Sequence, residues 1–180
     1  MQSLKGQLLI AGPSLLDPNF RRAVVLVGEH TDEGALGVVL NRASEATVED
    51  AVPELAALID DEALVHVGGP VQPSAIVVVA DFADPEQAGA LILDSVGFLP
   101  AEVDPDAIGE LHRVRVFAGY AGWGPGQLDE ELDEGSWIVA PALAEDVFTG
   151  DPEELWSDVL RRKGGPFQVL ALMPPDPSAN

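Results

Sequence analysis

Apolar runs separated by short polar turns dominate the first part of the chain. Residues 23–28 are almost continuously apolar, which predicts a strand covered on both faces of a sheet. Residues 35–42 form a second such run, and the connection at 29–34 contains Thr-Asp-Glu-Gly, which is of hairpin length. The pattern therefore predicts an antiparallel hairpin, preceded by a first strand over residues 4–11.

The later chain mixes strands with short helices. Thr47 is a suitable N-cap for one helix, and Asp151-Pro-Glu-Glu begins a better helix that runs through Arg162. The basic cluster at 161–163 fits the C-terminal end of that helix, where cations complement the dipole. Further strands are predicted from apolar runs at residues 63–67, 74–81, 113–118, 137–140 and 167–173.

These elements predict an α+β fold. We expect one domain over residues 1–173, with a mixed, largely antiparallel sheet and a few helices packed on it. The proline-rich end predicts a flexible C-terminal tail at residues 174–180. A regular parallel α/β arrangement would need a long crossover after nearly every strand, and the hairpin connections argue against it.

The most distinctive stretch is residues 119–137, which reads GYAGWGPGQLDEELDEGSW. Four glycines predict a loop over residues 119–126, and a short helix follows at 127–134 with carboxylates in its first turn. Gly135 is expected to be a left-handed C-cap, after which Trp137 begins a buried strand. The predicted order is strand, glycine loop, acidic helix and strand.

Charge and cysteine content exclude several classes of function. The 180 residues include 9 Lys plus Arg against 31 Asp plus Glu, a formal net charge of −22. Such a chain repels polyanions, so we expect no nucleic-acid partner and no membrane partner. With no cysteine, disulfides, thiolate nucleophiles and iron–sulfur clusters are excluded. We expect a cytoplasmic protein, because no apolar run reaches membrane-spanning length.

His30 is the histidine with the most polar neighbourhood. Together with Glu29 it lies near a strand end, and the hairpin is expected to bring Asn41 and Arg42 close to it. The four groups form a candidate binding or acid–base cluster. Alternatively, they are hydrogen bonds and an ion pair that hold the hairpin end, which is the more common arrangement in loops. His66 alternates with apolar residues and is expected to be a hydrogen-bonded strand residue.

The glycine-rich stretch has a structural and a functional interpretation. As a phosphate cradle it would lack one donor at Pro125, and its helix already carries its own carboxylates, so a structural turn is favoured. Trp123 and Trp137 form either an aromatic groove for a partner or rings that clamp the helix to the sheet, and packing is the simpler account. Because the sequence contains neither GxSxG nor HExxH, we assign no catalytic residue, no metal ligand and no cofactor.

Several short motifs, in a fixed order, resemble the YqgE/AlgH family of bacterial proteins. The resemblance runs nearly end to end and is weaker between Asp81 and Leu111. It implies a single cytoplasmic α+β domain with no agreed biochemical activity, in a family of which one branch is named as a transcriptional regulator of exopolysaccharide production. The motif residues are Asn19, Phe20, Arg21, Glu29, His30, Asn41, Gly68, Gly69, Pro70, Tyr120, Trp123, Gln127, Leu128 and Glu131.

The residues and the resemblance together favour a non-catalytic cytoplasmic protein that contacts an unknown protein or small molecule. A regulatory role is one form that such a function could take. One alternative is a hydrolase that uses His30 with Glu29 or Glu131. Another is a transcriptional regulator, which the net charge disfavours as a direct DNA binder. The sequence predicts no oligomeric state. The candidate binding surface comprises Glu29, His30, Asn41, Arg42, Gln127 and Glu131.

Overall fold

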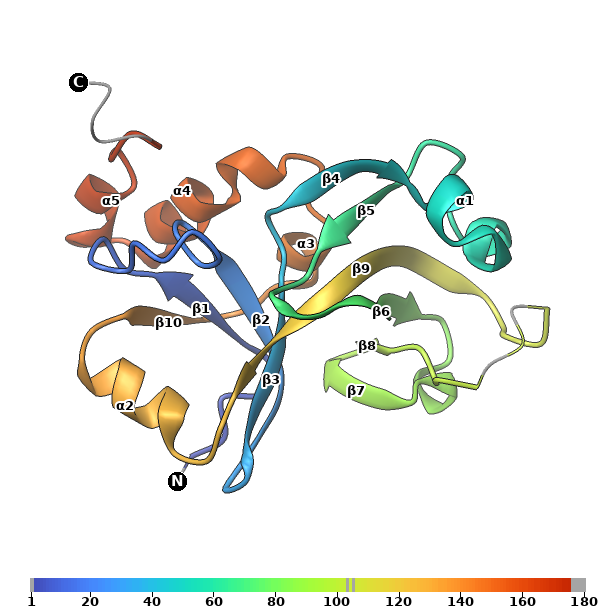
Figure 1. The fold of residues 1–180 in the computed structure, drawn as a ribbon, viewed down its shortest axis with the longest axis horizontal. Helices are drawn as coiled ribbons and strands as arrows, with labels where there is room; N and C mark the ends of the chain where they lie inside the picture. Colours follow the sequence, from blue (N-terminus) through green and yellow to red (C-terminus); the bar gives the residue numbers. More distant parts are fainter. Residues whose placement is uncertain (1, 103, 105, 176–180) are drawn as a thin grey trace.

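A computed structural model describes residues 2–102, 104 and 106–175 of the chain (Figure 1). Ten strands form the sheet in this part. They are β1 (Gln7–Ala11), β2 (Val24–Thr31), β3 (Gly34–Val39), β4 (Ala43–Thr47), β5 (Leu64–Val67), β6 (Val71–Phe82), β7 (Ala90–Leu93), β8 (Val96–Phe98), β9 (Leu111–Trp123) and β10 (Trp137–Pro141).

Short helices join and cover these strands. They are α1 (Val48–Ala51), the 3₁₀ helices η1 (Pro53–Leu58) and η2 (Pro85–Gln87), α2 (Gln127–Asp133), α3 (Ala144–Val147), α4 (Pro152–Lys163) and α5 (Phe167–Leu170). The main strand order is β10-β1-β2-β3-β9-β6-β8-β7, while β5 pairs with both β4 and β9. All pairings are antiparallel except that of β5 with β9, so the predicted α+β fold with a mixed, largely antiparallel sheet is confirmed.

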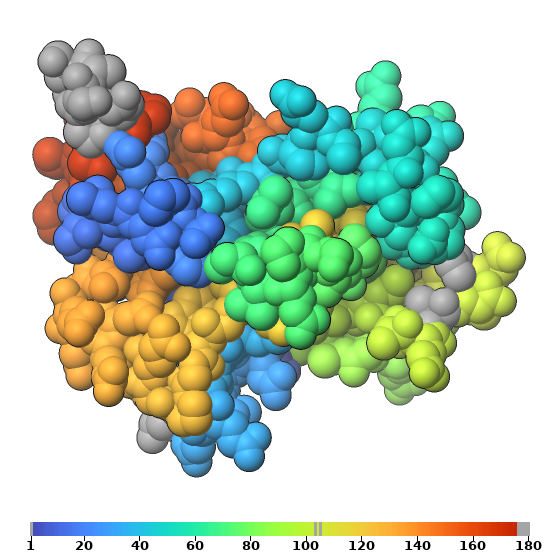
Figure 2. Space-filling model, in the orientation of Figure 1, coloured from blue at the N-terminus to red at the C-terminus, as the bar shows by residue number. Residues whose placement is uncertain are grey.

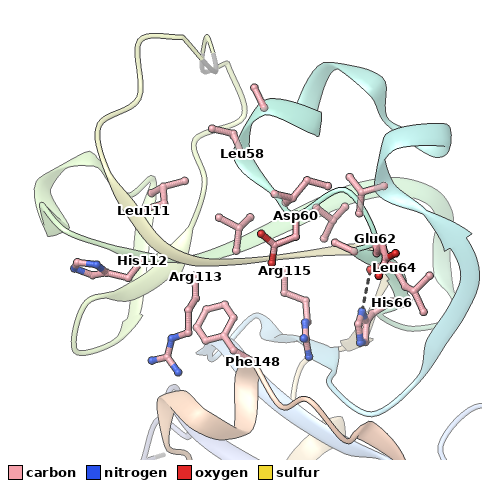
Figure 3. A pocket seen from close by; sticks show the side chains of 16 residues that line it. Leu58, Asp60, Glu62, Leu64, His66, Leu111, His112, Arg113, Arg115 and Phe148 are labelled. Atoms are coloured by element: carbon pink, nitrogen blue, oxygen red, sulfur yellow. Dashed lines mark hydrogen bonds between the residues drawn. The ribbon is translucent and has the colours of Figure 1, made fainter.

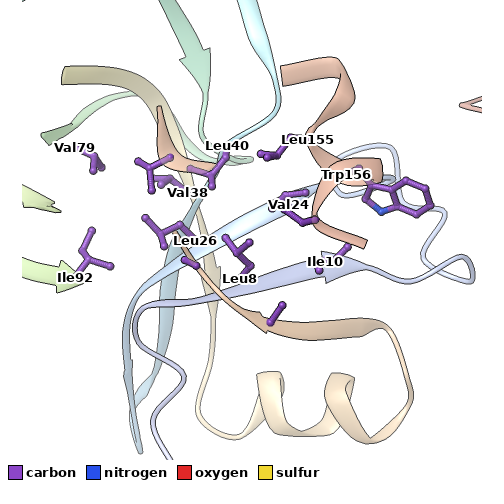
Figure 4. Close-up of a cluster of buried hydrophobic side chains, with 14 of the residues drawn as sticks. Leu8, Ile10, Val24, Leu26, Val38, Leu40, Val79, Ile92, Leu155 and Trp156 are labelled. Atoms are coloured by element: carbon purple, nitrogen blue, oxygen red, sulfur yellow. The ribbon is translucent and has the colours of Figure 1, made fainter. Parts of the chain in front are cut away.

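The hairpin of β2 and β3 lies at the centre of one half of the sheet. Its strands pair from Val25 opposite Val39 to His30 opposite Ala35, as the apolar pattern predicts. Both faces of β2 are covered. Val24 and Leu26 pack beneath α4 (Figure 4). Val25 and Val27 lie on the other face and pack in a cluster with Leu128 of α2 and the tryptophans of β9 and β10. A strand buried on both sides explains the uninterrupted apolar run.

Strand β9 connects the two halves of the sheet, which corrects the predicted glycine loop. It pairs with β6 over most of its length, then bends at Gly119 and pairs with β3 through residues 121–123. Gly119 has a φ of +76°, and a Cβ added there would collide with the carbonyl oxygen of Gly69, so a side chain fits neither the backbone conformation nor the space. Gly119 therefore allows the strand to change partners, Gly122 lies within the strand, and the loop is limited to residues 124–126.

The acidic helix after this loop forms as predicted. Gly135 has a φ of +79°, and the N–H groups of Gly135 and Ser136 reach back to the carbonyls of Leu132 and Glu131. This is the left-handed C-cap expected from the sequence.

Figure 2 shows α2, in orange, separated from the α1 and η1 segment, in cyan, by the turn between β5 and β6, in green.

The chain from Phe167 does not form the predicted final strand. Gly164 and Gly165, with φ values of +80° and +60°, turn the chain back after α4, and α5 packs against that helix. The apolar run thus contacts a helix rather than a strand edge, and its period does not distinguish the two. Of the predicted tail, residues 176–180 lie outside the described part. No helix in the described part is long and apolar enough to cross a membrane.

Candidate functional site

His30 is buried in β2 and supports the fold. The residue is 7% exposed, and Nδ1 accepts a hydrogen bond of 3.0 Å from the backbone N–H of Leu4. The imidazole therefore ties the N-terminal segment to the hairpin. Glu29 is exposed, because successive side chains of a strand lie on opposite faces.

Asn41 and Arg42 lie at the opposite end of the hairpin from His30, so the expected cluster of four polar groups is wrong. His30 is beside the turn, whereas residues that follow β3 return to the start of β2, as an antiparallel register requires. Asn41 accepts a hydrogen bond of 2.9 Å from the N–H of Val24 and donates one of 2.8 Å to the carbonyl of Arg22. Arg42 donates to two carbonyls of the turn before β2.

Gln127 and Glu131 are brought together on α2, where they hold two tryptophans. Gln127 donates a hydrogen bond of 2.9 Å to Glu131 Oε2, and Glu131 Oε1 accepts from the indoles of Trp123 at 3.1 Å and Trp137 at 2.9 Å. The indoles pack edge to face with ring centroids 6.0 Å apart, and both are buried. The prediction that the rings clamp the helix to the sheet is confirmed.

A cleft of about 740 Å³ lies beside an unpaired edge of β9 (Figure 3). One edge of β9 pairs with β6. Along the other, β3 pairs with residues 121–123 and β5 with residues 117–118, and no strand of the described chain pairs with Leu111–Val116. The volume is within the range of small-molecule sites.

Strands β5 and β9 diverge to form this cleft. Their parallel pairing consists of His66 with Phe117 and Val67 with Ala118. Continued by two residues, the register would place Leu64 opposite Arg115, but these residues do not pair, although β5 remains paired with β4 on its other edge as far as Leu64. The space between the strands is therefore closed at His66 and widens towards the start of β9.

Strand alternation places the charged side chains of the cleft on one face. Arg113 and Arg115 point to the same side of β9, with Phe148 of the α3 segment between them (Figure 3). Val114 and Val116 point to the other side, into an apolar cluster beneath α1 and η1. The Arg-Val-Arg-Val sequence thus serves two environments, one polar and one apolar.

Arg115 is a cation without a carboxylate partner in the described part of the chain. Its Nη1 donates a hydrogen bond of 2.7 Å to the carbonyl of Thr149, and no salt bridge is formed there. Burial lowers the pKa of Arg115 from its ordinary value. A guanidinium carries five N–H donors, and Arg115 lines the cleft, so it has donors beyond the one used on Thr149.

His66 lies beside this guanidinium at the closed end of the cleft. The residue is 5% exposed, Nδ1 is 3.3 Å from the carbonyl of Leu64, and Nε2 has no hydrogen-bond partner in the described part. Burial, followed by the charge of Arg115, lowers the pKa of His66 to about 4, so the ring is neutral at pH 7. The expectation of a fully hydrogen-bonded histidine is wrong, because the ring packs against Phe117.

Arg113, in contrast, is neutralised within the protein. It donates a hydrogen bond of 3.1 Å to Asp81, which also accepts one of 2.6 Å from Ser95. Burial acts to raise the pKa of Asp81, but these hydrogen bonds from Ser95 and Arg113 outweigh it and the pKa is lowered. The guanidinium carbon of Arg113 lies 4.8 Å from the ring centroid of Phe148. Arg113 therefore fixes the wall beside Arg115 and supplies no net charge.

The opposite wall comes from the segment that leads into β5. Asp60 and Glu62 are exposed on it, and Leu58 and Ile59 are half-buried. A ligand in the cleft would thus meet a cation at the closed end and carboxylates at the rim. The lining contains no hydroxyl, thiol or amine side chain, so it offers no ordinary nucleophile beside its histidines.

Sequence reasoning missed both Arg115 and His66. Arg115 is one of only nine Lys and Arg residues, and it lies between two valines in a largely apolar strand. A rare cation within an apolar strand indicates a partly buried charge, so this pattern could have identified Arg115. The divergence of β5 from β9, which turns the position into a cleft, left no trace in the local sequence.

Comparison with known proteins gives a consistent result. The sequence profile of the family described as AlgH-like matches residues 8–168. A UPF0301 protein of Streptomyces coelicolor is 44% identical over 187 residues, covering 100% of this chain and 97% of that protein. A UPF0301 protein of Thermobifida fusca is 43% identical, with coverages of 99% and 96%.

Two solved structures share the fold. A crystal structure of a protein from Corynebacterium diphtheriae has a TM-score of 0.86 and 30% identity, covering 95% of this chain and 93% of that one. The solution structure of the AlgH protein from Pseudomonas aeruginosa has a TM-score of 0.72 and 29% identity, with coverages of 97% and 98%.

Proposed function

The chain belongs to the AlgH-like family, and we propose that it is a non-catalytic binding protein that holds an anionic group of its ligand in the β9 cleft. The observation that carries the proposal is Arg115, a partly buried guanidinium with no carboxylate partner in the described chain. Arg113, two residues away, has its partner in Asp81. Of the two arginines of the cleft, the contrast therefore supports a ligand charge at Arg115 and not at Arg113.

The charge composition strengthens this argument. With 31 acidic and 9 basic residues, a carboxylate partner for Arg115 would be easy to supply from the chain itself. A buried charge without a partner is costly, and proteins keep such charges where a function uses them. Guanidinium groups bind carboxylates and phosphates through two parallel hydrogen bonds, so either anion suits this position.

The other functional hypotheses have less support. The hydrolase hypothesis needs an accessible His30, but this imidazole accepts a hydrogen bond from Leu4 and is absent from the cleft lining. Direct DNA binding needs a basic surface, and the net charge is −22. We propose a cytoplasmic location, which the lack of cysteine supports, and a regulatory role is compatible with binding that involves no chemistry.

The proposal is tested by titrating the protein with sodium acetate and with inorganic phosphate, against sodium chloride at matched ionic strength. Amide chemical shifts and the Arg115 Nε–H resonance are followed by NMR. We expect saturable shifts confined to residues that line the cleft, with dissociation constants in the millimolar range because a lone anion makes few contacts.

Arg115→Gln is the diagnostic variant, and Arg161→Gln is its control. Arg161 is an exposed cation on α4 that pairs with surface carboxylates, so its loss changes the net charge equally and leaves the cleft intact. Acetate or phosphate binding should vanish in the first variant and persist in the second. An absence of saturable shifts in the unmodified protein, or equal binding by both variants, would overturn the proposal.

A further inference from the structure

We infer that the ligand of the β9 cleft is the C-terminal end of an extended peptide, which adds a strand to the unpaired edge of β9 and places its terminal carboxylate at Arg115. The inference rests on the proposed function and deepens it, because it names the chemical class of the ligand. Two independent observations support it: the strand edge and the position of the cation along that edge.

The strand edge supplies backbone hydrogen bonds. Leu111–Val116 pairs with β6 on one side only, and within the described chain the other side faces the cleft. A strand edge of six residues extends roughly 20 Å and presents N–H and C=O groups that a peptide can pair with. Adding a strand to a sheet edge is a common mode of peptide recognition.

The cation lies where such a peptide would have to end. Strands β5 and β9 come together at His66 and Phe117, so an added strand that enters from the start of β9 is stopped there. Arg115 is two residues before this closure, and its guanidinium lies beside His66. A chain terminus carries a carboxylate at the point where the strand stops, which matches the charge at the closed end.

The rim selects the residues that precede the terminus. Asp60 and Glu62 are exposed on the wall opposite β9, and the whole chain has a net charge of −22. Cationic side chains on the peptide would meet these carboxylates and be attracted to the protein from a distance. Half-buried Leu58 and Val114 accommodate apolar side chains at the alternate positions.

The experiment uses acetyl-Lys-Val-Lys-Val with a free carboxylate as the probe and isothermal titration calorimetry as the readout. Its controls are the same peptide with a C-terminal amide, the same peptide with N-methylated backbone nitrogens, and sodium acetate. Because the amide carries one more net positive charge, non-specific attraction to this acidic protein would favour the amide. Recognition of the carboxylate predicts the reverse order.

We expect the free acid to bind at least about tenfold more tightly than the amide, the N-methylated peptide and acetate, and to lose this advantage with Arg115→Gln but not with Arg161→Gln. Binding of acetate without any gain from the peptide would refute the inference and leave the proposed function standing. Failure of every probe to bind would refute both. Equal binding of acid and amide would refute the terminal-carboxylate assignment.

Discussion

The buried imidazole of His66 predicts a loss of stability on acidification. Its pKa is about 4 in the folded protein, against an ordinary value of 6.5 in the unfolded chain. Below pH 6.5 the unfolded chain therefore binds a proton that the folded protein does not. The stabilising contribution of neutral His66 is complete above pH 6.5, declines as the pH falls, and is lost once the pH passes 4.

The size of the effect follows from the two pKa values. Between pH 6.5 and pH 5 the unfolded state gains about 1.4 kcal/mol per pH unit, or about 2 kcal/mol. Solvent around the partly open cleft screens the charge, which reduces the expectation to about 1 kcal/mol. Substitution by glutamine removes the titrating group and keeps a polar side chain of similar reach.

The assay is urea unfolding of the unmodified protein, His66→Gln and His112→Gln at pH 7 and pH 5. His112 is an exposed histidine of β9, the strand that pairs with the strand of His66, and it serves as the matched control. Many carboxylates also titrate over this interval, so the informative quantity is the difference between variants. His66→Gln should lose less stability on acidification than the other two proteins, by about 1 kcal/mol.

An NMR titration of the histidine ring protons gives an independent test. The resonance assigned to His66 should remain that of a neutral ring at pH 5. A midpoint near 6.5, or identical pH dependence of all three proteins in urea, would refute the reasoning that burial and Arg115 suppress protonation.

Three further predictions concern the scaffold. Glu131→Gln disturbs the acceptor of two indole N–H groups and should lower the free energy of unfolding by about 1–3 kcal/mol, whereas exposed Glu130→Gln on the same helix should have little effect. Gly69→Ala, whose new methyl would collide with the backbone of the neighbouring strand, should lower the free energy of unfolding by more than about 3 kcal/mol. Gly150→Ala, with open space around it, should be tolerated, and urea unfolding of both variants checks the difference. Trp156→Phe removes a buried 3.0 Å hydrogen bond to a backbone carbonyl and should lower the urea midpoint by the equivalent of about 1–3 kcal/mol.

Local sequence patterns were sufficient for several elements. The hairpin of β2 and β3 could be predicted because both strands are apolar runs joined by a polar turn, and neither requires a distant partner. The acidic helix α2 could be predicted because its carboxylates, leucine spacing and terminal glycine act within one or two turns. The contact of two tryptophans with this helix followed from their size and position.

Three predictions were wrong because each feature depends on contacts between residues that are far apart in the sequence. Phe167–Leu170 is helical because it packs on α4, and the same residues would have suited a strand. Gly119 lies in a strand because two partners on different sides require a bend there. The prediction that His30 lies near Asn41 was wrong because the register of the hairpin places these two residues at opposite ends.

By itself, then, the sequence determined the fold class, the family and the elements whose signals lie within a few neighbouring residues. Tertiary structure alone decided where the cleft is. That cleft exists because β5 leaves β9 after two paired residues, while β5 stays paired with β4 on its other edge. Arg115 and His66 acquire their shared environment only through that pairing, since burial and proximity are properties of the assembled sheet and not of either strand.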